Sequence, residues 1–82
     1  MKTYMVVFEK SADGWGAYAP DVPGCGTTGA TVDEALANIK EALELWVEAT
    51  QEQGGVIPEA AHQFAAYVDV DTSAALTPGA QP

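Results

Sequence analysis

The sequence has 82 residues, 48% of them hydrophobic, with 12 acidic residues against three basic ones and a formal net charge of −9. This length gives a single domain, and the hydrophobic content is too high for a disordered chain. Direct nucleic-acid binding is not expected, because Lys and Arg contacts to phosphates supply most of its affinity. The acidic charge instead favours solubility and rapid encounter with a basic partner.

The chain shows no targeting or membrane signal. Glu9 and Lys10 end the N-terminal apolar run too early for a signal peptide. No apolar run approaches the roughly 18 residues of a membrane-spanning helix. Cys25 is the only cysteine, so no internal disulfide can form. We therefore expect a cytoplasmic protein that does not enter a membrane.

Three short strands are predicted in the first half of the chain, where β-branched and aromatic residues are bounded by turn signals. The Asp13-Gly14 pair is typical of a hairpin turn between the first two strands. Pro20 and Pro23 interrupt the chain after the second strand, because proline cannot take part in a central ladder. The strands are expected at residues 3–10, 15–19 and 25–28.

The clearest predicted element is a helix from Thr31 to about Gln53. Thr31 is a good N-cap, and Glu34 three residues later completes a capping box. Gly54-Gly55 ends the helix. The apolar residues recur at helical spacing and form one stripe, made of Val32, Ala35, Leu36, Ile39, Ala42, Leu43 and Trp46.

A last strand is predicted from Phe64 to Val70, after a linker over residues 56–61, because its apolar residues alternate. From Thr72 the chain is small, polar and rich in Pro and Gly, which is typical of a frayed tail. The sequence thus predicts one domain over residues 1–71 and a flexible tail over 72–82. The predicted fold is α+β, in the order β-β-β-α-β, with one helix on a small antiparallel-rich sheet.

The first predicted strand is apolar on both faces, which indicates self-association. One helix can cover only one face of a small sheet, so the other face or a strand edge should bury itself against a second copy. We expect a dimer or a tetramer, although a monomer with some exposed apolar residues is the simpler alternative. The interface candidates are Tyr4, Val6, Phe8, Trp15 and Tyr18.

No catalytic residue, metal site or cofactor is indicated. His62 stands in a linker with no acid or nucleophile beside it in sequence, so a plain exposed side chain is the simpler interpretation. Cys25 lacks the electropositive neighbours that would activate its thiolate. Asp69 and Asp71 alternate onto one strand face, but two acids are a weak metal signal in so acidic a chain. The glycines lack the spacing of a phosphate-binding loop.

Several short motifs follow one another in a specific order. An Asp-Gly-Trp run precedes the sequence Pro-Asp-Val-Pro-Gly-Cys, a Gly-Ala-Thr turn and a helix that opens with Glu-Ala-Leu. In content and order, these motifs over residues 4–59 resemble the HicB-like antitoxin domain. The residues that carry the resemblance include Asp13, Gly14, Trp15, Pro20, Asp21, Pro23, Gly24, Cys25, Glu34 and Ala35.

The resemblance implies a degenerate ribonuclease-H-like domain that lacks catalytic acids, forms homo-oligomers and neutralises an RNA-cleaving HicA-type toxin. Many family members continue into a DNA-binding segment, and the residues after Val70 have no such pattern, so we expect a solitary form without operator binding. Two other hypotheses remain open. One is an oligomeric binding protein with a different partner, and the other is a residual metal-dependent ribonuclease that uses Asp69, Asp71 and Glu9.

Overall fold

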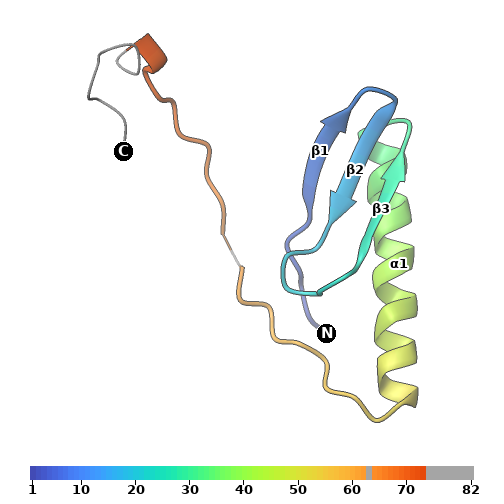
Figure 1. Ribbon diagram of the computed structural model, residues 1–82. Coiled ribbons are helices and arrows are strands. Elements are labelled where there is room, and N and C mark those ends of the chain that lie inside the picture. Colours follow the sequence, from blue (N-terminus) through green and yellow to red (C-terminus); the bar gives the residue numbers. More distant parts are fainter. Residues whose placement is uncertain (63, 74–82) are drawn as a thin grey trace.

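The computed structural model describes residues 1–62 and 64–73, in which three strands are followed by one helix (Figure 1). The strands form one antiparallel sheet in the order β1-β2-β3, and α1 packs mainly on β3 and then on β2. This arrangement confirms the predicted α+β fold through its first four elements. The elements are β1 Val7–Ser11, β2 Gly14–Tyr18, β3 Gly26–Gly29 and α1 Val32–Glu52.

The first strand is shorter than predicted, because it begins at Val7 rather than Thr3. Val7 lies opposite Tyr18, which is the last residue of β2. The chain then turns away at Pro20, so no part of β2 is left to pair with residues 3–6.

The pairing register decides which face of β1 lies toward the helix. Residues directly opposite each other in an antiparallel sheet share a face. Phe8 lies opposite Ala17, which is buried in the core, and Val7 lies opposite the exposed Tyr18. The even-numbered residues of β1 therefore point toward α1, and Val7 points to the opposite, open face of the sheet.

Both ends of α1 are capped as the sequence predicts. The Thr31 hydroxyl accepts the N–H of Glu34 at 3.1 Å, and the Glu34 carboxylate accepts the N–H of Ala30 at 3.1 Å. At the other end, the N–H of Gly54 donates to Gln51 at 3.1 Å, and that of Gly55 donates to Thr50 at 2.8 Å. This pair of bonds is a Schellman motif, which satisfies carbonyls that the helix leaves unpaired.

The core is small and built largely from small side chains. Gly29 lets α1 approach β3 closely, since a Cβ at this position would lie 2.4 Å from the backbone nitrogen of Ala35. The predicted helix stripe is only partly buried, because Val32 and Leu36 at its start are 38% and 49% exposed. The buried hydrophobic residues are Ala17, Ala19, Val22, Cys25, Ala35 and Ile39.

The last strand, predicted from Phe64 to Val70, does not form in the described chain. These residues are extended but make no ladder, and Figure 1 shows them running apart from the sheet and the helix. A strand is defined by a hydrogen-bonded neighbour, and nothing within residues 1–62 and 64–73 supplies one here. The predicted domain end at residue 71 stays a prediction, and most of the predicted tail, residues 74–82, lies outside the described residues.

Replacing Ile39 by Ala tests the size of this core. Ile39 has no exposed surface, so we expect Ile39→Ala to lower the free energy of unfolding by about 2–5 kcal/mol through lost burial and the cavity left behind. Leu45→Ala on the same helix is the matched control, because Leu45 is 59% exposed and should change stability by no more than about 0.5 kcal/mol. Urea unfolding followed by circular dichroism measures both, and equal losses would contradict the assigned core.

Candidate protein-interaction surface

The loop between β2 and β3 is built from two consecutive turns. The N–H of Val22 donates to the carbonyl of Ala19 at 3.1 Å, and the N–H of Cys25 donates to the carbonyl of Val22 at 3.1 Å. Gly24 has a φ of +78°, which fits the third position of a type II turn that has Pro23 before it. The two turns bury the side chains of Val22 and Cys25 in the core.

Asp21 in this loop holds the linker that follows α1. One of its carboxylate oxygens accepts the backbone N–H of His62 at 2.8 Å, and the other lies 2.6 Å from His62 Nδ1. The Asp21 side chain is only 7% exposed. These hydrogen bonds, from the His62 backbone first and from its ring second, hold the pKa of Asp21 below its ordinary value. The histidine that looked isolated in sequence therefore has an acidic partner 41 residues earlier.

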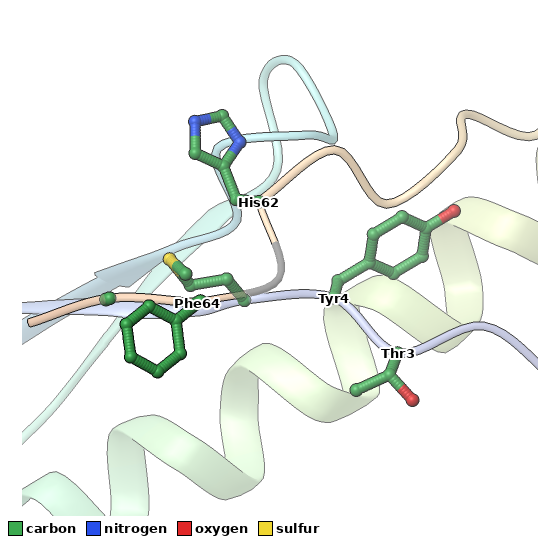
Figure 2. Close-up of a pocket in the computed structure, with 6 residues that line it drawn as sticks. Thr3, Tyr4, His62 and Phe64 are labelled. Atoms are coloured by element: carbon green, nitrogen blue, oxygen red, sulfur yellow. The ribbon is translucent and has the colours of Figure 1, made fainter.

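Two further contacts hold the linker to the N-terminal segment. The Tyr4 hydroxyl donates to the carbonyl of Pro58, and the Lys2 ammonium pairs with Glu59, which raises the pKa of Lys2. Figure 2 shows the shallow depression where the linker meets this segment. Its lining residues are Thr3, Tyr4, Met5, His62, Phe64 and Ala65.

The open face of the sheet carries one large exposed aromatic residue. Tyr18 is 40% exposed, and the half-buried Val7 lies directly opposite it. Gly16 and Gly26 share this face and have no side chains, and Glu9 lies on it opposite Gly16. An exposed aromatic residue beside a partly buried apolar one is typical of a protein interface.

The structure divides the five predicted interface residues between the two faces. Tyr4, Val6, Phe8 and Trp15 are partly buried and pack against the core, whereas Tyr18 lies on the open face. The Lys10 ammonium lies 5.4 Å from the centre of the Trp15 ring, a cation–π contact on the helix side. Val7 was not among the predicted interface residues, and the hairpin register places it on the open face opposite Tyr18.

The acidic, histidine and cysteine side chains of the described residues do not gather into a metal site. Among residues 1–62 and 64–73, no three His, Cys, Asp or Glu side chains lie close enough together to hold a metal ion. The Asp71 carboxylate instead accepts the N–H and the hydroxyl of Ser73, at 3.0 and 2.6 Å. Burial raises the pKa of the Cys25 thiol, which opposes thiolate reactivity. No helix in the described residues is long and apolar enough to cross a membrane.

Comparisons with known proteins place these features in a family context. A family model described as the HicB_like antitoxin of bacterial toxin–antitoxin systems matches residues 4–75. A 14.9 kDa protein of Haemophilus phage HP1 is 39% identical over 68% of this chain and 42% of its own length. Antitoxin HicB 2 of Photorhabdus laumondii is 36% identical over 88% of this chain and 52% of its own length.

A solved structure, described as the HicA3 and HicB3 toxin–antitoxin complex, contains a chain of similar fold. It is 27% identical to this one, with a TM-score of 0.61, and the match covers 72% of each chain. This chain spans about half of the length of the two curated relatives above.

The contact between Asp21 and His62 predicts a specific pH response. The pKa of Asp21 is lower in the folded chain than the ordinary value of about 3.9. The contact therefore contributes fully above that ordinary value, and its contribution is lost as the pH falls through the lowered one. In an NMR titration, the amide proton of His62 should shift with a midpoint below about pH 3.9.

The matched variants for this titration are Asp21→Ala and Asp69→Ala. Asp21→Ala should abolish the shift of the His62 amide, because it removes both acceptor oxygens. Asp69→Ala should leave the shift unchanged, because Asp69 lies beyond the linker on the exposed segment. A midpoint at or above the ordinary Asp value would show that the contact is not made in solution.

Proposed function

The chain belongs to the HicB-like antitoxin family of bacterial toxin–antitoxin systems, and we propose that it neutralises a HicA-type RNA-cleaving toxin by binding it. The observation that carries this proposal is the family match over residues 4–75, together with a structural relative drawn from a HicA–HicB complex. In this role the chain acts through its surface and not through catalysis.

The charge of the chain suits a ribonuclease as partner. A protein that cleaves RNA needs basic residues to hold the phosphate backbone, and this chain has 12 acidic residues against three basic ones. The formal net charge of −9 gives the chain a strongly negative field, which favours fast and specific association with a basic surface.

We place the toxin-binding surface on the open face of the sheet, around Tyr18. Tyrosine is a frequent centre of binding energy in interfaces, because it buries a large area at little cost in conformational entropy. The half-buried Val7 lies directly opposite it and adds apolar area on the same face. A homo-oligomeric state and a cytoplasmic location, both expected from the sequence, complete the proposal.

The test starts from the genes on either side of this one: a small basic ribonuclease encoded there is purified and assayed for binding to this chain and for inhibition by it. We expect RNA cleavage to stop at a fixed molar ratio of the two proteins. Tyr18→Ala should weaken the complex at least tenfold, which corresponds to about 1.4 kcal/mol. Leu45→Ala, on the exposed side of α1, is the control and should leave the affinity unchanged.

Other outcomes of the same assay separate the remaining hypotheses. If no ribonuclease is bound or inhibited, the antitoxin proposal fails and a different protein partner is indicated. If the purified chain itself cuts RNA with Mg²⁺ or Mn²⁺, and Asp69→Asn abolishes the cutting, the chain is an enzyme. Equal affinity of Tyr18→Ala and the wild type would move the binding surface away from the open face.

A further inference from the structure

The segment from Phe64 to Val70 has the pattern of a strand but no strand pairs with it within residues 1–62 and 64–73. Phe64, Tyr67, Val68 and Val70 are 88%, 106%, 79% and 74% exposed. The radius of gyration is 17.1 Å, against about 12 Å for a compact domain of this length. So much exposed apolar surface in a small domain indicates that the segment is buried by something else.

The outer edge of β1 offers the hydrogen bonds that such a segment lacks. Ser11 and Gly14 face each other across the two-residue hairpin loop, so the odd-numbered residues of β1 bond toward β2. The backbone N–H and C=O groups of Phe8 and Lys10 consequently point away from the sheet. No strand within residues 1–62 and 64–73 pairs with this edge, and an open edge of this kind accepts an added strand.

The opposite edge of the sheet is a poorer acceptor. The same register points the backbone groups of Gly26 and Thr28 outward from β3. The side-chain amide of Asn38 on α1 already donates to the carbonyl of Thr28 at 2.8 Å. β3 is also only four residues long and has the helix packed against it. The longer edge of β1 is therefore the better acceptor for an extended segment.

The linker contacts determine where the segment starts. Tyr4, Lys2 and Asp21 hold residues 58–62 against the N-terminal segment and the loop after β2. Phe64 and Ala65 line the depression beside Thr3, where Phe64 is still largely exposed, and the other exposed apolar residues follow them (Figure 2). In each chain, the start of the segment is thus held near one end of β1, and the apolar residues after it extend away from the domain.

We propose that two copies of this chain exchange residues 64–70, so that the segment of each copy adds to the outer edge of β1 in the other. A reciprocal exchange closes with two-fold symmetry, and it leaves neither β1 edge nor either segment exposed. The alternation of Phe64, Ala66, Val68 and Val70 against Ala65, Tyr67 and Asp69 fits a strand with two different faces. The inference does not depend on the identity of the toxin.

Proline substitutions test both halves of the exchange. In a strand only every second N–H points to a given neighbour, so Tyr67→Pro combined with Val68→Pro removes one donor to the acceptor strand in either register. Lys10→Pro removes an outward donor of β1 and leaves the ladder to β2 intact. Light scattering should give twice the chain mass of 8.5 kDa for the wild type and 8.5 kDa for each variant. Thr72→Pro lies beyond the segment and should remain a dimer. Circular dichroism checks that α1 persists throughout.

Mixing the two monomeric variants distinguishes exchange from pairing within one chain. The Lys10→Pro chain keeps an intact segment, and the chain with two prolines keeps an intact β1 edge, so together they can form one of the two exchanged contacts. Native mass spectrometry over a concentration series should detect the heterodimer where each variant alone is monomeric. A monomeric wild type, a dimer that persists in either variant, or a mixture that never forms the heterodimer would each overturn the proposal.

Discussion

The organisation of this molecule depends on how little apolar surface a single helix can bury. α1 packs on β3 and β2 through Ala35 and Ile39, while β1 lies at the far edge of the sheet. The open face and the outer edge of β1 receive no cover from the described part of the chain. A domain of this length buries only about 60% of the surface of its unfolded chain, so cover from another chain is a direct way to gain stability.

The loop after β2 links this small core to the rest of the chain. Its two turns place Val22 and Cys25 inside, and the same backbone path presents Asp21 to the linker, where it accepts both hydrogen bonds of His62. One six-residue motif therefore serves packing and linker attachment together. A change at Pro23 or Gly24 would disturb the turn, and with it the position at which residues 64–70 leave the domain.

Local signals in the sequence were sufficient for the three strands and the helix of the described fold and for their order. Thr31 and Glu34 predict the start of α1, and Gly54-Gly55 predicts its end, because caps depend only on near neighbours. The face of β1 that meets the helix depends on the offset of the hairpin, which composition does not determine. The contact of Asp21 with His62 joins residues 41 apart, so no local pattern indicates it. The alternation after Phe64 predicted a strand, but alternation carries no information about which chain supplies the neighbour.

The proposed toxin-binding surface around Tyr18 and the proposed strand exchange at the edge of β1 are compatible with one another. A strand added to the edge of β1 lies in the plane of the sheet, so it widens the open face without covering Tyr18. A toxin on that face and a second copy at the edge therefore do not compete for the same atoms. A toxin that contacts both Tyr18 and the added strand would bind the dimer more tightly than the monomer. By thermodynamic reciprocity such a toxin would then stabilise the dimer by the same factor, so toxin binding and self-association would reinforce each other.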